Sequence, residues 1–149
     1  MRTSPTPEIV IHAQRLMVEL EQAVVAFPRK HKYLLGLDLR RWAQQANMLT
    51  QRTWRARAHK LEQARLVQLL IDEMDLLKLG LQTGDALQCF SSKGCFESLA
   101  KLAAGVGRQA GGWHKEIAKH LNGQSPAAEM PLERPEILST AAASQGAQR

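Results

Sequence analysis

Apolar residues recur at alternating intervals of three and four residues in the second half of the chain, and this pattern restricts the fold more than any other feature. On an α-helix such spacing places every apolar side chain on one face. Kept over about three heptads, it forms the seam of helices that pack at about 20° to one another. The pattern therefore predicts a long, packed helix from about Cys95 to Leu121. Its apolar residues are Phe96, Leu99, Ala103, Val106, Ala110, Trp113 and Ile117.

Three earlier segments show similar spacing and predict helices at about Glu8 to Ala26, Arg29 to Arg55 and Lys60 to Leu87. Pro28 separates the first two, since proline removes a backbone donor and disfavours helical backbone in the residue before it. Seven residues are aromatic, whereas Ala, Leu and Gln are abundant, which favours helices over strands. Four amphipathic helices with short connections predict an all-α, up-down-up-down four-helix bundle. The buried residues predicted for these three helices are Ile9, Ala13, Leu16, Leu20, Val24, Leu35, Leu39, Trp42, Ala46, Leu49, Val67, Leu70, Ile71, Met74, Leu77 and Leu81.

The chain has 149 residues, which is enough for one domain with an apolar core. We expect a flexible leader at 1–7, the bundle at 8–121 and a disordered tail at 122–149, where Pro, Ala, Ser, Gln and Gly replace the apolar pattern. No apolar run approaches the ~20 residues that cross a bilayer, and no secretory signal is recognisable. Without an export signal, Cys89 and Cys95 are more often reduced thiols than a disulfide. These features predict a cytoplasmic protein that has no membrane partner.

Positive charge is concentrated in the segment from Pro28 to Lys60. This segment holds nine Lys or Arg residues and one acid, Asp38, whereas the whole chain has a formal net charge of +6. The rest of the chain is therefore net negative. A solvated helix face normally carries mixed signs, with Glu placed to pair with Lys or Arg four residues away. One-sided charge favours a polyanionic or acidic partner instead, either a nucleic acid or an acidic protein.

Three cations of this segment are spaced eleven residues apart, at Lys30, Arg41 and Arg52. Eleven residues advance a helix by three turns with about 20° of drift, so on one continuous helix these side chains line up opposite Leu39. Contacts with phosphates fix position without reading bases, so we expect no sequence specificity from this stripe. The candidate binding cations of the segment are Arg29, Lys30, Lys32, Arg40, Arg41, Arg52, Arg55, Arg57 and Lys60.

No combination of residues in the sequence predicts catalysis or metal binding. The five histidines lack the spacing and the carboxylate partners of a zinc or iron site on a helix. The acids Asp72, Glu73 and Asp75 are typical of a solvated helix surface. We therefore expect no enzyme activity, no catalytic residue, no metal and no cofactor. Gly107 and Gly111 predict close approach of a neighbouring helix or subunit, because each glycine costs about 1 kcal/mol in a helix interior.

Two strings of residues resemble a known family. Residues 27–33, Phe-Pro-Arg-Lys-His-Lys-Tyr, with Leu-Gly and Ala-Asn further on, resemble the start of the second helix in small four-helix-bundle proteins. Those proteins include the accessory variability determinant of diversity-generating retroelements. Residues 106–115, Val-Gly-Arg-Gln-Ala-Gly-Gly-Trp-His-Lys, resemble the last-helix signature of the same family. The resemblance covers about residues 8 to 121, with a longer segment between Leu79 and Phe96 than the family usually has.

The resemblance implies a non-enzymatic partner of a reverse transcriptase. It implies a homopentameric barrel whose positive surface contacts the polymerase and the template RNA during mutagenic cDNA synthesis. Within the matching strings, this role falls on Arg29, Lys30, Lys32 and Arg108. The expected partners are thus a reverse transcriptase, structured RNA with DNA as an alternative, and further copies of the chain. Two alternatives stay open: an oligomeric scaffold that binds an acidic protein, and a sister group of bundle proteins, of obscure role, encoded in intervening sequences of bacterial large-subunit rRNA genes.

Overall fold

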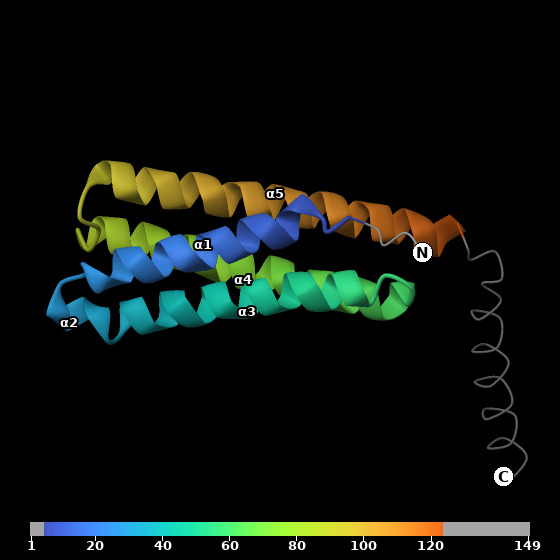
Figure 1. The fold of residues 1–149 in the computed structure, drawn as a ribbon, viewed down its shortest axis with the longest axis horizontal. Coiled ribbons are helices and arrows are strands. Elements are labelled where there is room, and N and C mark those ends of the chain that lie inside the picture. Colours follow the sequence, from blue (N-terminus) through green and yellow to red (C-terminus); the bar gives the residue numbers. More distant parts are fainter. Residues whose placement is uncertain (1–4, 124–149) are drawn as a thin grey trace, which may run out of the picture.

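The computed structural model describes residues 5–123, and within this range all regular structure is helical. The helices are α1 (Glu8–Val25), α2 (Arg29–Lys32), α3 (Leu35–Arg55), α4 (Lys60–Ala86) and α5 (Lys93–Gly123). The long helices α1, α3, α4 and α5 run alternately in opposite directions along one axis (Figure 1). The all-α four-helix bundle predicted from the sequence is confirmed.

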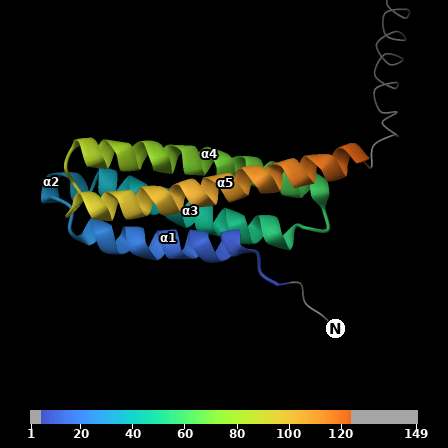
Figure 2. The same ribbon diagram turned by 90° about the horizontal axis from the view of Figure 1, so that it is seen from above.

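Each long helix packs against two others and faces the remaining one diagonally across the core. α3 packs against α1 and α4, and α5 packs against the same two helices. α3 and α5 therefore lie on opposite sides of the bundle, and so do α1 and α4 (Figures 1 and 2). The outer surface of the bundle consists of four helix faces in the circular order α1, α3, α4, α5.

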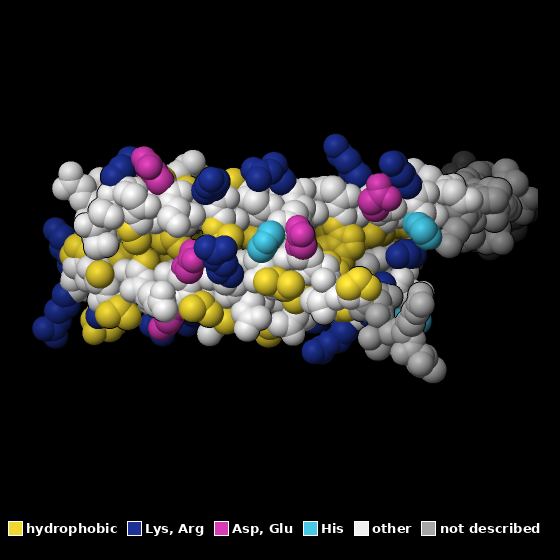
Figure 3. All heavy atoms as spheres, turned by 45° about the horizontal axis from the view of Figure 1, so that its top comes forward, with side chains coloured by type: hydrophobic (Ala, Val, Ile, Leu, Met, Phe, Trp, Pro, Cys, Tyr) yellow, Lys and Arg dark blue, Asp and Glu magenta, His cyan; other side chains and the backbone are white. Residues whose placement is uncertain are grey.

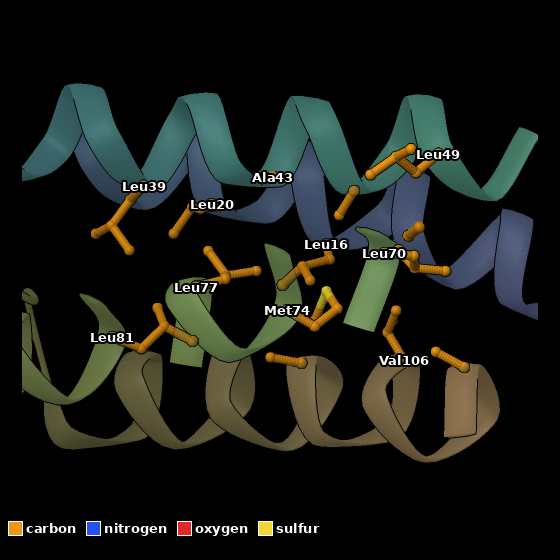
Figure 4. Packing of buried hydrophobic residues seen from close by; sticks show 14 of the residues in the cluster. Leu16, Leu20, Leu39, Ala43, Leu49, Leu70, Met74, Leu77, Leu81 and Val106 are labelled. Carbon is orange, nitrogen blue, oxygen red and sulfur yellow. The ribbon is translucent and has the colours of Figure 1, made fainter. Parts of the chain in front are cut away.

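The core is built from the residues that the apolar spacing predicts. Leu20 of α1, Leu39 of α3, Leu70 and Leu77 of α4 and Val106 of α5 have no exposed surface, and they meet between the helices (Figure 4). Burying one such side chain stabilises the fold by about 1.5–3 kcal/mol. Among the predicted core residues, those that are only partly buried and pack against the edge of the core are Leu35, Trp42, Ile71, Phe96 and Trp113.

The single helix predicted from Arg29 to Arg55 is wrong, because the structure has two helices there. α2 and α3 are separated by a turn at residues 33–34. No residue of α2 is buried, since its sequence Arg-Lys-His-Lys has no apolar face to pack against the bundle. α3 begins where the chain regains contact with α1, and a Cβ added to Gly36 would lie 2.8 Å from Cγ1 of Val24. Lys30 therefore does not share a helix with the other two cations of the eleven-residue series.

The tightest helix approach at a glycine is in α4 and not in α5. A Cβ added to Gly80 would lie 2.6 Å from the ring of Trp42 on α3, so no side chain fits here without movement of the ring. Among residues 5–123, Gly107 faces only the flexible end of Lys78, and Gly111 has nothing within 4 Å. No helix in this part of the chain therefore makes the close approach predicted at Gly111, and approach by another subunit stays a prediction.

α4 ends in a left-handed turn at Gln88, where φ is 57°. The N–H of Gln88 donates to the carbonyl of Asp85, and the N–H of Cys89 donates to the carbonyl of Gly84. These two bonds satisfy carbonyls that the end of a helix otherwise leaves without partners. Three rings pack at this end of the bundle, with neighbouring centroids 5.1 and 5.6 Å apart: Phe27, Phe90 and Phe96.

The predicted tail starts too early, since Asn122 and Gly123 belong to α5. The rest of the tail, 124–149, and the first part of the leader, 1–4, lie outside the described residues. Within residues 5–123, no helix is both long enough and apolar enough to span a bilayer. The two cysteines are free thiols.

Candidate nucleic-acid interface

The outward face of α3 carries three arginines, Arg41, Arg52 and Arg55, which we call the α3 row. All three are exposed, whereas Leu39 on the opposite face of the helix is fully buried. Among residues 5–123, none of the three arginines has an acidic oxygen within 4.0 Å. The α3 row is about 21 Å long, at 1.5 Å of helix rise per residue. It is the part of the predicted stripe that has the predicted orientation.

Arg40 does not belong to the α3 row. Its Nε donates a hydrogen bond of 2.6 Å to Oε2 of Glu21 on α1. Asp38 is the nearest acid along the sequence, whereas Glu21 becomes a neighbour only through the packing of α1 on α3. The two side chains are 46% and 51% exposed, so this pair contributes only about 0–1 kcal/mol to stability. It nevertheless neutralises the charge that the sequence assigned to Arg40.

One acid of α4, Glu62, lies close enough to the α3 row to interact with the charge of Arg52. Arg65 donates two hydrogen bonds to Glu62, of 3.0 and 2.6 Å, and this interaction lowers the pKa of the Glu62 carboxyl. The positive charge of Arg52 lowers that pKa further, by a smaller amount. Arg65 is therefore the partner of Glu62, and the guanidinium of Arg52 is left available to a ligand.

The three cations of α2 lie at one end of the bundle and not along the α3 row. They are Arg29, Lys30 and Lys32. Lys30 lies near the turn between α4 and α5, and its charge therefore acts on Cys89 in that turn. Burial raises the pKa of the Cys89 thiol, and the charge of Lys30 offsets part of this rise. The predicted alignment of Lys30 with the α3 row is therefore wrong, since α2 and α3 are separate helices.

Arg57 and Lys60 lie beyond the other end of α3: Arg57 is in the connection to α4, and Lys60 is the first residue of α4. The guanidinium of Arg57 stacks on the ring of Trp54 at 4.2 Å from the centroid, and its Nη1 also donates to the Trp54 carbonyl at 3.0 Å. Nζ of Lys60 donates to Oε1 of Gln63 at 3.1 Å, and Nε2 of Gln63 donates to the Thr53 carbonyl at 3.1 Å. These two cations are thus engaged in holding the turn together.

Arg108 lies on α5, diagonally opposite the α3 row. Lys101 and Lys115 lie seven residues to either side of it, and all three are exposed. Seven residues make almost two full turns, so these side chains share one face of α5. No acid occurs in the sequence between Glu97 and Glu116. We call Lys101, Arg108 and Lys115 the α5 row; sequence reasoning found only Arg108, although the seven-residue spacing was a usable signal.

A groove of about 460 Å³ lies between α1 and α5 beside the α5 row. Lys101 and Arg108 line it from α5, and Arg15 lines it from α1. A hydrogen bond of 2.8 Å between Nε2 of Gln109 and Nδ1 of His12 joins the two helices at this groove. Figure 3 shows this face of the molecule, with Lys and Arg side chains over α5 and an apolar band between α5 and α1.

The outward faces of α1 and α4 each carry a row of exposed apolar side chains. On α1, exposed Ile11, Val18 and Val25 follow one another at seven-residue intervals, and we call them the α1 row. On α4, four leucines between 40% and 77% exposed fall on the side away from the core. These leucines, the α4 row, are Leu61, Leu69, Leu76 and Leu79. Around the bundle, apolar and cationic rows therefore alternate.

Among residues 5–123, no three His, Cys, Asp or Glu side chains come close enough together to hold a metal ion. No protein-family model, curated protein or solved structure matches the chain. What is shown is an all-α protein with four long helices, and the resemblance to the retroelement accessory family stays a prediction.

Proposed function

We propose that this protein is a non-catalytic RNA-binding protein that acts as the accessory protein of a diversity-generating retroelement. In this role it binds the reverse transcriptase and its template RNA. The observation that carries the proposal is the α3 row. Its three exposed guanidinium groups have no acidic partner among residues 5–123 and are presented by one rigid helix.

The length of the α3 row, and not its residue type, favours a phosphate backbone over an acidic protein. All three cations are arginines, whose planar fork of donors matches phosphate and carboxylate oxygens alike. A row about 21 Å long suits a ligand with regularly repeated negative charge, and an RNA strand provides that charge in any sequence. The retroelement role rests on the resemblance at residues 27–33 and 106–115. A reverse transcriptase gene beside a template repeat in the genomic neighbourhood would support that role.

Charge reversal in the α3 row tests RNA binding. In the Arg41→Glu, Arg52→Glu double variant we expect RNA affinity to fall by at least about tenfold at low salt. We also expect the slope of log affinity against log salt to fall by about two, because each phosphate contact contributes about 0.7 to 0.9 to that slope. Fluorescence anisotropy of a labelled RNA hairpin over a salt series measures both quantities.

The matched control reverses one cation on α4 and one on α5, in the Lys78→Glu, Lys93→Glu variant, because neither lysine belongs to the α3 row or lies beside it. Both double variants change the net charge equally, so a loss of affinity confined to the α3 variant assigns binding to the α3 row. Equal losses in the two variants would mean that net charge alone attracts RNA. Unchanged affinity in the α3 variant would leave binding of an acidic protein as the better account of the row.

We also propose the homopentameric assembly that the resemblance implies. Exposed apolar rows of this length are typical of association surfaces. The α1 row and the α4 row lie on opposite sides of the bundle, so contact between the α1 row of one copy and the α4 row of the next is head-to-tail. Head-to-tail contacts generate a ring when the rotation between copies closes.

Light scattering on the purified protein tests this assembly. We expect a pentamer mass for the natural chain and a smaller mass for Leu69→Gln with Leu76→Gln. The same substitutions at Leu34 and Leu37, which are exposed but outside both apolar rows, serve as the control. A monomeric natural chain at micromolar concentration would contradict the assembly.

A further inference from the structure

We infer that one copy of this protein binds two separate RNA segments at once, one along the α3 row and one along the α5 row, and so bridges them. This inference rests on the proposed RNA binding and adds a second site to it. The second site consists of the α5 row together with the groove between α1 and α5.

The cations of the α5 row are as available to a ligand as those of the α3 row. Among residues 5–123, none of Lys101, Arg108 and Lys115 has an acidic oxygen within 4.0 Å. Glu97 and Glu116 mark the two ends of the row, and Glu116 is paired with Lys119. Three cations over about 21 Å of helix give the α5 row the same length and charge as the α3 row.

The groove gives the α5 row a concave border. Glu19 is the acid that lines it, and this carboxylate is paired with Arg15 at 3.0 Å. The guanidinium of Arg108 lies over Gly105, where a Cβ would be 3.8 Å from its Nη2. The absence of a side chain at Gly105 keeps the groove open beside Arg108, so a phosphate there can contact Arg108 and Lys101 together.

One continuous RNA segment cannot occupy both rows, because the rows lie on opposite sides of the bundle. The α1 row and the α4 row occupy the two surfaces between them. The bundle is about two helix diameters thick, or about 20 Å, and a phosphate backbone gains nothing from crossing apolar surface. Each row therefore takes its own segment, either from two RNA molecules or from two parts of one folded RNA.

A capture assay tests bridging. A biotin-labelled RNA hairpin is fixed to beads, and a fluorescent hairpin of the same sequence is added with the protein. The parent protein carries Leu69→Gln with Leu76→Gln, so that copies do not assemble and any bridging comes from one copy. Three double variants of this parent are compared with it: Arg41→Glu with Arg52→Glu, Lys101→Glu with Arg108→Glu, and the control Lys78→Glu with Lys93→Glu. The protein concentration is set for each so that the same fraction of fixed RNA is occupied.

We expect the parent and the control to retain the fluorescent RNA, and each row variant to lose at least about tenfold of that signal. Full capture by the α5 variant would overturn the inference, since the α5 row would then not hold the second RNA. A parent that does not capture the second RNA would overturn it too. A natural chain that binds no RNA would instead refute the proposed function, and the inference with it.

Discussion

α3 and α4 are packed neighbours with the same role in the fold, yet their outer faces are opposite in character. Both helices bury a stripe of apolar side chains against the same core. On its outward side α3 exposes the three arginines of the α3 row together with Met48, whereas α4 exposes the four leucines of the α4 row. Folding determines only the inward half of each helix. The outward halves are free to differ, so the side chains that they expose are the ones that indicate function.

The same contrast recurs between α5 and α1 across the bundle. α5 carries the cationic α5 row and α1 carries the apolar α1 row. Two cationic rows separated by two apolar rows suit a protein that meets polyanions on two sides and protein surface on the other two. Such a protein requires the inward and outward halves of each helix to be independent, so that a substitution on the outward half leaves the stability of the fold unchanged.

The largest expected effect is on the free energy of unfolding, and it distinguishes the buried face of α4 from the exposed one. Leu77 is 0% exposed and its neighbour Leu76 is 43% exposed. We expect Leu77→Ala to lower the free energy of unfolding by about 2–5 kcal/mol, because it leaves a cavity in the core. Leu76→Ala should change that free energy by less than about 0.5 kcal/mol. Urea unfolding followed by circular dichroism measures both.

The Leu76 result must be read at a protein concentration low enough to dissociate any assembly. A large loss at Leu76 under that condition would show that the outer face of α4 also supports the monomer. The comparison of α3 with α4 would then fail, since the α4 row would belong to the fold.

A second, smaller effect concerns two glycines with opposite surroundings. We expect Gly80→Ala to destabilise the protein by about 1–3 kcal/mol, because the new Cβ would lie 2.6 Å from the ring of Trp42 on α3. Gly112→Ala should stabilise the monomer by up to about 1 kcal/mol, because Ala is the better helix former. Among residues 5–123, no atom lies within 4 Å of a Cβ added at Gly112, so the new methyl group meets no obstacle. Thermal unfolding of the two variants gives both signs.

The outcome at Gly112 also bears on assembly. If Gly112→Ala stabilises the dissociated chain but reduces the mass of the oligomer, another subunit approaches this glycine. If Gly80→Ala is neutral, Trp42 does not fix the spacing of α3 and α4 as tightly as the structure indicates.

The fold could be read from the sequence because the apolar spacing is a local signal. Each turn of α1, α3, α4 and α5 repeats it, so the core follows from counting residues. The break between α2 and α3 did not follow, because no proline separates residues 29–32 from the apolar spacing that begins at Leu35. It depends on whether residues 29–32 find anything to pack against. The close fit of Gly80 on Trp42 was also hidden, since it joins residues far apart in the sequence.

The candidate site was predictable in part for the same reason. The orientation of Arg41 and Arg52 follows from helix geometry, whereas the pairing of Arg40 with Glu21 depends on how α1 lies on α3. The α5 row is a local seven-residue pattern and was available. It was overlooked because its three cations contribute little to a segment that is mostly apolar.

The smallest expected effect on the free energy of unfolding is at Glu73, at the boundary between the outer faces of α3 and α4. Glu73 is seven residues before Gly80 and so lies on the α3 side of α4. Its Oε2 is buried and has no hydrogen-bond partner within residues 5–123. Burial raises the pKa of Glu73 above its ordinary value of 4.5, and the nearby charge of Asp72 adds to this rise.

A raised pKa means that folding favours the protonated form of Glu73. The stability that this group contributes is therefore present below pH 4.5 and is lost as the pH rises through the pKa of the folded state. We expect Glu73→Gln to raise the free energy of unfolding at pH 7 by up to about 0.5 kcal/mol, and this gain to vanish in acid. When Asp72→Asn removes the smaller cause of the raised pKa, the gain from Glu73→Gln at pH 7 should become smaller. Unfolding titrations from acid to neutral pH check both expectations. A gain of the same size at every pH would mean that Glu73→Gln acts through packing and not through charge.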